Sequence, residues 1–187
     1  KTIARHWLPE DEDSHVLGDI LVWDSQTIIT SDSLAGDILK LDLQTGQFQA
    51  IGDGTDLPNP QGLSRGINGQ QIYIADYLAG LFSLDMSSGK LNRLSNPGLA
   101  AVHGIDGLIR CNNTLVGIQN GVRPQRIVAF QLDAQGQQIT EHRVLAKGLP
   151  NWDEPTQGIH FGQQILYVAN SHWPQFDSDG QIPSGLD

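Results

Sequence analysis

The sequence repeats a pattern of two short apolar runs about every 45 residues. The first runs start 42, 45 and 51 residues apart, and the second runs end 44, 44 and 50 residues apart. Two markers that stay in step over four copies are typical of a propeller or a solenoid. The first runs start at Asp19, Gln61, Asp106 and Gln157, and the second runs end at Asp32, Asp76, Asn120 and Asn170. This repeat constrains the fold more than any local pattern does.

Each copy divides into short strands separated by turn residues. In the second copy the sequence predicts four strands, at 62–66, 71–76, 80–85 and 90–94. Asn68-Gly69, between the first two, is a hairpin signal because both residues tolerate positive φ. The Asp-x-x-Thr/Ser-Gly segments at 42–46 and 85–89, with a variant at 133–136, predict turns in which the aspartate bonds the backbone and the glycine is left-handed.

The second strand of each copy is an almost unbroken apolar run. These runs cover residues 27–30, 72–75, 115–118 and 165–169. Such a strand is buried on both faces, as happens when each sheet packs against a neighbour on either side. Helices are not expected, because Gly and Pro interrupt every longer stretch. The sequence therefore predicts an all-β protein, a β-propeller of four-stranded blades whose inner strands line a central channel.

We expect one propeller domain, or a fragment of one, over residues 1–187. The blades are expected at about 17–57, 58–99, 100–150 and 151–187, with residues 1–9 as the outer strand of a preceding blade. The fourth copy ends in 180–185 without a clear outer strand. These counts favour the larger part of a six-bladed ring, with a closed four-bladed ring as the alternative. Because the chain begins with Lys1 rather than Met, we also expect that a preceding part was removed.

The composition limits the classes of binding partner that we expect. The chain carries 11 Lys and Arg against 21 Asp and Glu, a formal net charge of −10. This charge repels phosphate backbones and anionic lipids, so nucleic-acid and membrane partners are not expected. Cys111 is the only cysteine, which excludes an intrachain disulfide and a thiolate zinc site. Without a membrane-span pattern or a signal peptide, we expect a soluble protein, either cytoplasmic or exported after processing.

The polar residues that start the innermost strands form the first candidate site. In successive blades of a propeller these positions converge near the channel axis. The residues are Asp19, Gln61, Asp106 and Gln157. Calcium binds six to eight oxygens of carboxylates, amides, carbonyls and water, so such a ring is a candidate metal site, with Asp106, Asp19 and Gln61 as ligands. The alternative is that these side chains bond one another, the neighbouring backbone and water.

Two histidines precede the inner strands. His15 and His103 lie four and three residues before Asp19 and Asp106, which places them near the same channel mouth. A histidine with a near-neutral pKa is suited to general acid or base catalysis, so both are candidate catalytic residues together with Asp106. The alternative is a solvated loop histidine.

Other polar and aromatic loop residues are candidates for substrate contact. Asn120 is expected to contact the substrate, although Asn before Gly also makes an ordinary turn. Gln157 is the second substrate-binding candidate. The acids of Asp153-Glu154 either line the channel mouth or face solvent, and aromatic residues such as Tyr77 and Trp173 either wall a pocket or pack at its rim.

The repeat and the string GIDGLIRCNNTLVGIQNGVRPQRIVAFQLD resemble the six-bladed propellers of the regucalcin-like gluconolactonase family, which is also similar to paraoxonases and strictosidine synthase. The resemblance covers about residues 17–170. It implies a divalent metal, commonly calcium, held at one channel mouth by an acid of the first blade, asparagines of middle blades and an aspartate of a Pro-Asp-Gly segment. Asp106 matches that aspartate, Gln61 replaces one asparagine, and Gly18-Asp19 replaces an Asn-Asp pair. The first-blade acid has no counterpart in this sequence.

Two functions follow as expectations. The first is a metal-dependent hydrolase of lactones or related esters, gluconolactonase-like or arylesterase-like. In it, the metal polarises the carbonyl group while a carboxylate or histidine activates water. The second is a non-catalytic propeller that binds a small molecule or a protein, because fold does not dictate function. No phosphate loop, Gly-x-Ser-x-Gly elbow or His-Glu-x-x-His motif is present, which argues against nucleotide-binding, serine-hydrolase and zinc-protease functions.

Overall fold

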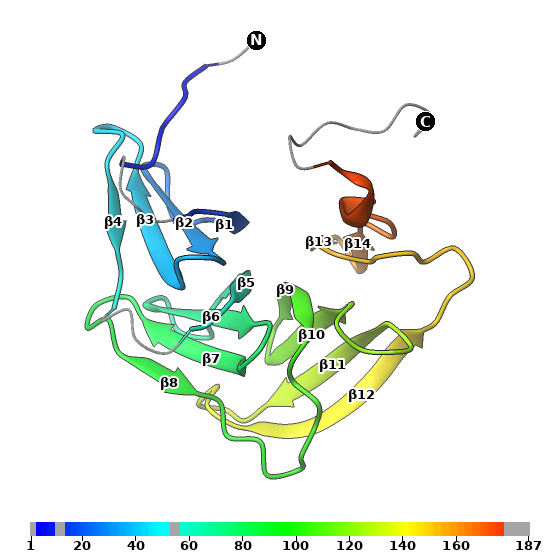
Figure 1. The fold of residues 1–187 in the computed structure, drawn as a ribbon. Helices are drawn as coiled ribbons and strands as arrows, with labels where there is room; N and C mark the ends of the chain where they lie inside the picture. Colours follow the sequence, from blue (N-terminus) through cyan, green and yellow to red (C-terminus); the bar gives the residue numbers. More distant parts are fainter. Residues whose placement is uncertain (1–2, 10–13, 53–56, 178–187) are drawn as a thin grey trace.

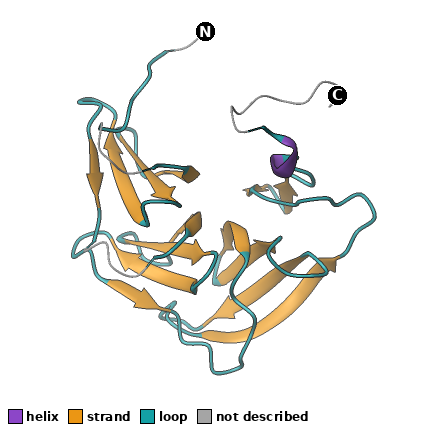
Figure 2. Cartoon of the chain, viewed as in Figure 1, coloured by secondary structure: helices purple, strands orange, loops and turns teal. Residues whose placement is uncertain are grey.

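The computed structural model describes residues 3–9, 14–52 and 57–177. Within them the chain consists of strands, turns and one short 3₁₀ helix, η1 (Trp173–Gln175) (Figure 2). The first sheet contains β1 (Leu17–Val22), β2 (Thr27–Asp32), β3 (Asp37–Asp42) and β4 (Phe48–Ala50). The second contains β5 (Pro60–Arg65), β6 (Gln71–Asp76), β7 (Gly80–Asp85) and β8 (Leu91–Arg93). The third contains β9 (Ile105–Cys111), β10 (Thr114–Gln119), β11 (Arg126–Leu132) and β12 (Ile139–Lys147), and the fourth contains β13 (Gly158–Phe161) and β14 (Gln164–Tyr167).

These sheets are the blades of a β-propeller. Three are four-stranded and the fourth is two-stranded in the described residues, and each is antiparallel with its strands in sequence order. Figure 1 shows the four sheets arranged in an arc, with the first strand of each toward the centre and β4, β8 and β12 outside. The inner strands β1, β5, β9 and β13 contact one another in that order. The predicted all-β propeller fold is confirmed, and two strands of the second copy, 71–76 and 80–85, have the predicted bounds.

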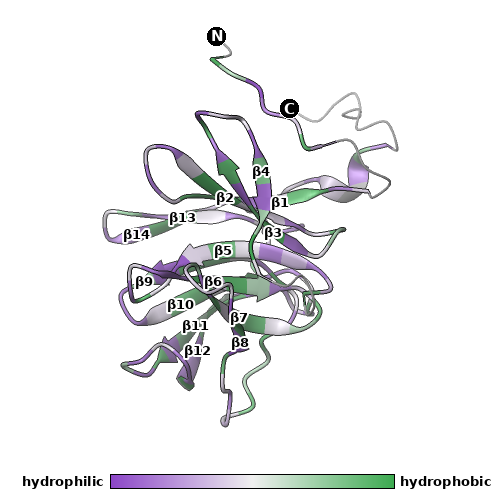
Figure 3. Ribbon diagram, turned by 90° about the vertical axis from the view of Figure 1, so that its left-hand side faces the viewer, coloured by the Kyte–Doolittle hydropathy of each residue, from purple (hydrophilic) through white to green (hydrophobic). Residues whose placement is uncertain are grey.

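Strand β6 shows why the sequence selects this architecture. All six of its residues are buried, and its side chains alternate between two cores. Ile72 and Ile74 belong to the core shared with the first blade, whereas Tyr73 and Ala75 belong to the core shared with the third blade. An unbroken apolar strand is therefore the pattern that covers both faces of a stacked blade. Figure 3 shows hydrophobic residues along the successive second strands.

The outer turns follow the predicted aspartate chemistry. The carboxylate of Asp42 accepts hydrogen bonds from the backbone N–H groups of the second and third following residues, and Asp85 does the same. Gly46 and Gly89 close these turns with φ of 73° and 70°. Asn68-Gly69 lies in the predicted turn between the antiparallel strands β5 and β6, although neither residue is left-handed. The connection between β5 and β6 is longer than a two-residue hairpin turn, and the Asn68 side chain instead accepts a bond from the N–H of Gln70.

Glycine allows the inner strands to approach each other closely. A methyl group on Gly62 of β5 would lie 2.6 Å from both the carbonyl oxygen of Asp106 and the backbone nitrogen of Leu108. No side chain fits between β5 and β9 at this point, so the two blades meet backbone to backbone. The close approach brings Gln61, next to Gly62, and Asp106 to the same region of the axis.

Replacing Gly62 with alanine is expected to lower the free energy of unfolding by about 2 kcal/mol, because β5 and β9 must move apart to admit the methyl group. The matched control is Gly69→Ala, where an added methyl group meets no atom within 4 Å. We expect that variant to stay within about 0.5 kcal/mol of the wild type. Urea denaturation measures both, and equal losses would show that the backbones do not approach closely.

The two ends of the arc present apolar side chains. On β1, Ile20 and Val22 are 65% and 63% exposed, and on β13, Ile159 and Phe161 are 60% and 66% exposed. The corresponding leucine of β5, Leu63, is instead buried against the first blade. The end faces thus have the composition of a blade-to-blade interface. The choice between a six-bladed and a four-bladed ring stays a prediction.

The predictions for the chain ends have different outcomes. Residues 3–9 contain no strand, and the expectation that residues 1–9 form the outer strand of a preceding blade stays a prediction. A strand needs a partner strand for its backbone groups, and Figure 1 shows this segment leading away from the four sheets. The end of the fourth copy at 180–185 lies outside the described residues. In the described part of the chain, no helix has the length and apolarity needed to cross a membrane.

Candidate functional site

The inner strands carry an irregularity at the same place in three blades. The pairing of each inner strand with its neighbour shifts at this point, so that the inner strand contains one extra residue. Such β-bulges change the direction in which a side chain points. Gly18 and Asp19 lie opposite Ser31, Gln61 and Gly62 lie opposite Ala75, and Asp106 is the extra residue between Ile105 and Gly107. The bulges therefore decide which residues face the axis.

In the first blade the bulge shifts the position equivalent to Gln61 by one residue from the one that the sequence predicts. The register aligns Gly18, not Asp19, with Gln61. The carboxylate of Asp19 accepts bonds from the backbone N–H groups of Leu63 (2.7 Å) and Ile20 (2.7 Å), so it joins the first blade to the second. Asp19 does not line the axial cavity, and Gly18 does. Residue spacing alone does not reveal which of the two bulge residues turns inward, and a role of Asp19 as a metal ligand stays a prediction.

A cavity of about 470 Å³ lies where the four inner strands meet, and all four blades contribute to its wall. It brings together Gln61, Asp106, Asn120 and Gln157, four of the residues that the sequence singled out. Its other lining residues are Val16, Leu17, Gly18, Ser33, Leu34, Asn59, Tyr77, Glu154, Thr156, Ser171 and Trp173. We call this space the axial cavity.

Asp106 is the centre of the hydrogen-bond network in the axial cavity. The Asn120 amide donates from Nδ2 to its Oδ2 (2.7 Å), and the Gln157 amide donates from Nε2 to its Oδ1 (3.4 Å). The hydroxyl of Tyr77 donates to Oδ1 of Asn120 (3.0 Å). The network therefore joins three blades, and it fixes the Asn120 side chain between a phenol and an acid. Separately, Gln61 donates from Nε2 to Oδ1 of Asn59 (3.1 Å).

The electrostatics of this network favour a protonated carboxyl group. Burial raises the pKa of Asp106 to about 6, against the lowering effect of the Asn120 hydrogen bond, and the charges of Glu154 and Asp19 raise it further. Near pH 6 this group is half protonated, so it both donates and accepts hydrogen bonds. A carboxyl group that titrates near neutrality in a cavity is a mark of a functional site.

Glu154 and Tyr77 complete the polar part of the axial cavity. The sequence left open whether Glu154 faces solvent, and the structure places it in the cavity wall, where the Ser171 hydroxyl donates to its Oε2. Burial raises the pKa of Tyr77, and the charges of Asp106 and Glu154 raise it further, so its phenol remains a hydrogen-bond donor. These two residues follow no periodic pattern, so only the folded loops reveal their position.

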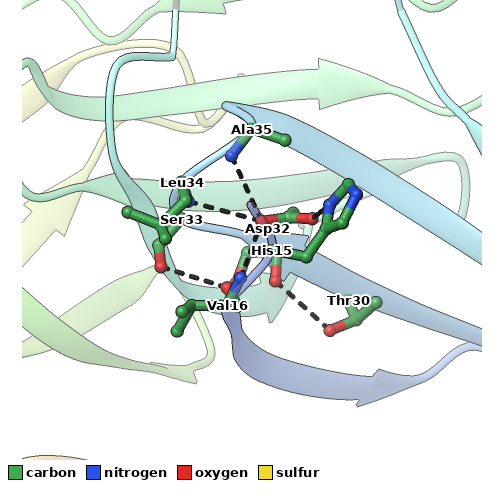
Figure 4. Close-up of polar contacts among 8 residues, drawn as sticks. His15, Val16, Thr30, Asp32, Ser33, Leu34 and Ala35 are labelled. Atoms are coloured by element: carbon green, nitrogen blue, oxygen red, sulfur yellow. Dashed lines mark hydrogen bonds and ion pairs between the residues drawn. The ribbon is translucent and has the colours of Figure 1, made fainter. Parts of the chain in front are cut away.

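The histidines lie outside the axial cavity. His103 is exposed, and its backbone carbonyl oxygen accepts a hydrogen bond from Nε2 of Gln119 (2.8 Å). Nδ1 of His15 lies 2.5 Å from Oδ2 of Asp32. That buried carboxylate also accepts bonds from three backbone N–H groups, those of Val16, Leu34 and Ala35 (Figure 4). The position of His15 is thus explained by its contact with a structural aspartate, and a catalytic role for either histidine stays a prediction.

The side chains around Asp106 do not form a calcium site in the described residues. Calcium requires six to eight oxygen ligands. Asn120 and Gln157 instead turn amide nitrogens toward the carboxylate. Among residues 3–9, 14–52 and 57–177, no group of three or more His, Cys, Asp and Glu side chains is placed to hold a metal ion. Calcium binding at Asp106 therefore stays a prediction.

Comparison with known proteins supports the fold. No protein-family model matches the sequence, and no curated protein matches it. A chain of the nidogen/laminin complex is similar in structure, with a TM-score of 0.62 and 17% identity over 86% of this chain and 73% of that chain. A catalytically inactive virginiamycin B lyase from Staphylococcus aureus, with quinupristin, has a TM-score of 0.61 and 12% identity over 87% of this chain and 51% of that chain.

An auxiliary nutrient binding protein from Bacteroides thetaiotaomicron is also similar, with a TM-score of 0.58 and 16% identity over 76% of this chain and 37% of that chain. The chain thus spans about half of the lyase chain and about a third of the nutrient-binding chain. These neighbours have β-propeller-type folds. At such identities the likeness establishes the fold alone. The chain is a β-propeller protein with a cavity at its axis that is lined by both polar and apolar residues.

Proposed function

We propose that the axial cavity binds a small organic molecule, with Asp106 at the polar end of the site. The observation that carries this proposal is the convergence of hydrogen-bonding side chains from separate blades on one cavity. Gln61, Asp106 and Gln157 come from the bulged or starting segments of three inner strands, and Asn120 from the loop after β10. Sites of this kind combine a few placed polar groups with apolar walls.

The apolar part of the wall lies on the first and last blades. Val16, Leu17 and Leu34 are 38%, 44% and 57% exposed, and Trp173 is 67% exposed. Together they offer a hydrophobic contact area beside the polar network. The cavity volume of about 470 Å³ is in the range of small-molecule sites. A ligand with an oxygen-bearing or charged end and an apolar body fits this arrangement.

Two of the structural neighbours are connected with small molecules. One is a lyase with quinupristin, and another is a nutrient binding protein. This is an analogy at the level of the fold, so it supports the presence of a ligand and says nothing of its identity. The identity must come from the cavity itself.

Hydrolysis of a lactone or ester is the second candidate function, favoured by the raised pKa of Asp106. A carboxylate with a pKa of about 6 is ionised at pH 7.5 and is a stronger base than an ordinary aspartate. In this proposal Asp106 accepts a proton from water as the water oxygen bonds to the carbonyl carbon. When the ester C–O bond breaks, Asp106 returns the proton to the leaving alkoxide, which yields acid and alcohol. The metal-dependent form of this reaction, suggested by the resemblance to gluconolactonases, is tested alongside.

Binding in the axial cavity is expected to move the side-chain amide signals of Asn120 and Gln157 in ¹H–¹⁵N spectra, because both amides contact Asp106. A library of small carboxylic acids, amines, lactones and alcohols supplies the probes. The competing site is a second cavity of about 420 Å³ between the first two blades, lined by residues that include Trp23, Lys40 and Met86. Hits that shift backbone signals around this second cavity and leave both amides unchanged would contradict the proposal.

Hydrolysis is tested by acid release from glucono-δ-lactone and phenyl acetate at constant pH, with added calcium or a chelator. If Asp106 is the base, Asp106→Asn is expected to lower the rate about 10²-fold or more. Glu141→Gln is the matched control, because Glu141 is an exposed acid on β12, away from the axial cavity. A rate that survives in Asp106→Asn would refute hydrolysis by this residue, and a rate unaffected by the chelator would refute the metal-dependent form.

A further inference from the structure

The axial cavity contains acids and no base. Asp106 and Glu154 are the charged residues in its wall, and no Lys, Arg or His is among the described residues that line it. The two acids are close enough that the charge of Glu154 raises the pKa of Asp106. The whole chain adds to this field, since its formal net charge is −10. The electrostatic potential of the cavity therefore favours a cation over an anion.

One basic residue, Arg123, lines a neighbouring cavity. Arg123 lines an adjacent cavity of about 450 Å³ that shares Tyr77, Asn120 and Glu154 with the axial cavity. Its guanidinium donates to the backbone carbonyl oxygens of Asn120 (2.8 Å) and Val122 (3.2 Å). These bonds keep the guanidinium in the loop after β10. Arg123 therefore does not supply a positive charge inside the axial cavity.

Aromatic rings accompany the acids. Tyr77 and Trp173 both line the axial cavity, and the backbone N–H of Trp173 donates to the Ser171 hydroxyl, which in turn donates to Glu154. The face of an aromatic ring attracts an ammonium group, and tryptophan does so most strongly. A cavity whose wall carries both an indole and a carboxylate is suited to an organic cation.

Size separates an organic cation from a metal ion. A metal ion needs a tight shell of ligand atoms, and the described residues offer no group of three or more acidic, imidazole or thiolate side chains around one point. The cavity measures about 470 Å³, and part of its wall is Val16, Leu17 and Leu34, which have no ligand atoms in their side chains. Such a wall fits the hydrocarbon part of an organic molecule.

We infer that the ligand of the axial cavity is an organic ammonium ion with an apolar, preferably aromatic, body. This inference rests on the proposed function, because it specifies the ligand of the same site. The N–H groups of the ammonium donate to the carboxylates of Asp106 and Glu154, and its body packs against Trp173 and the apolar wall. At pH 7.5 the Asp106 carboxyl group is ionised, since its pKa is about 6, and charge-assisted bonds of this type are the strongest that the cavity offers.

Three probes with similar bodies and different charges test the inference. They are 2-phenylethylamine, 2-phenylethanol and 3-phenylpropanoate, titrated into the whole chain at pH 7.5 and followed by the amide signals of Asn120 and Gln157. We expect the amine to bind at least about tenfold more tightly than the alcohol, and the carboxylate to bind least. Asp106→Asn and Glu154→Gln are each expected to remove most of the preference for the amine, whereas Glu141→Gln keeps it.

The outcomes separate this inference from the proposed function. If the alcohol or the carboxylate binds at the two amides as tightly as the amine, the inference is overturned and the axial cavity still stands as a binding site. If no probe affects the two amides and all bind elsewhere, both proposals fail. A preference for the amine that persists in Asp106→Asn and Glu154→Gln would also overturn the inference, because the acids would then not be its cause.

Discussion

Replacing Asp76 with alanine is expected to lower the free energy of unfolding by about 3 kcal/mol or more. Asp76 is fully buried at the end of β6, and its carboxylate accepts bonds from the backbone N–H groups of Asn59 (2.8 Å), Leu78 (3.0 Å) and Ala79 (2.6 Å). Alanine leaves three N–H groups without their acceptor in a place that water reaches poorly. For a chain of this length the melting temperature should fall by roughly 10 °C.

The matched control for Asp76 is Asp85→Ala. Asp85 also accepts bonds from the N–H groups of the second and third following residues, but its turn is exposed. Water replaces the lost acceptor there, so the destabilisation should be clearly smaller. Thermal and urea unfolding compare the two variants. An equal decrease in the free energy of unfolding in both variants would show that burial does not determine how much Asp76 stabilises the fold.

Replacing Asp106 with asparagine is expected to change how stability depends on pH. The pKa of Asp106 is about 6 in the folded protein, against 3.8 as the ordinary value. Between these values the folded state binds more protons than the unfolded state. The contribution of the protonated Asp106 to the free energy of unfolding is therefore largest at low pH and is lost as the pH rises through 6. A difference of this size corresponds to about 3 kcal/mol. Asp106→Asn should therefore gain about 2 kcal/mol relative to the wild type between pH 4 and pH 7.5, because part of the full difference lies below pH 4.

Comparing two pH values removes the effects of the substitution that do not depend on pH. Urea unfolding of the wild type and Asp106→Asn at pH 4, 5, 6 and 7.5 supplies the measurement. Glu141→Gln, which removes an exposed acid, should stay parallel to the wild type over the whole range. If Asp106→Asn also stays parallel, Asp106 has an ordinary pKa and the electrostatic description of the axial cavity is incorrect.

The fold was predictable from the sequence because the signals are repeated and local. The apolar run 72–75 and the aspartate turns at 42–46 and 85–89 each follow from one strand or one turn, and the repeat provides several copies of each. The convergence of Gln61, Asp106 and Gln157 also follows from the repeat, since equivalent positions in successive blades face the same axis. These features depend on periodicity, which a sequence displays directly.

The rest of the site depends on geometry that periodicity does not encode. Both Gly18 and Asp19 fit the spacing of the repeat, so the sequence alone does not show which of the two lines the axial cavity. That depends on how the first bulge orients them. Glu154 reaches the cavity through a loop without regular structure. The bond between Tyr77 and Asn120 joins residues 43 apart in two blades, so it arises only when the blades pack.

Measuring the pKa of Asp106 tests most directly whether this carboxyl group is buried at the centre of the hydrogen-bond network in the axial cavity. Carboxyl ¹³C signals followed from pH 3 to pH 8, with Asp106→Asn to identify the signal, would measure it. We expect a midpoint near 6, accompanied by a matching change in the side-chain amide signals of Asn120. A midpoint near 3.8, or one near 6 that leaves the Asn120 amide unchanged, would contradict this description of the site.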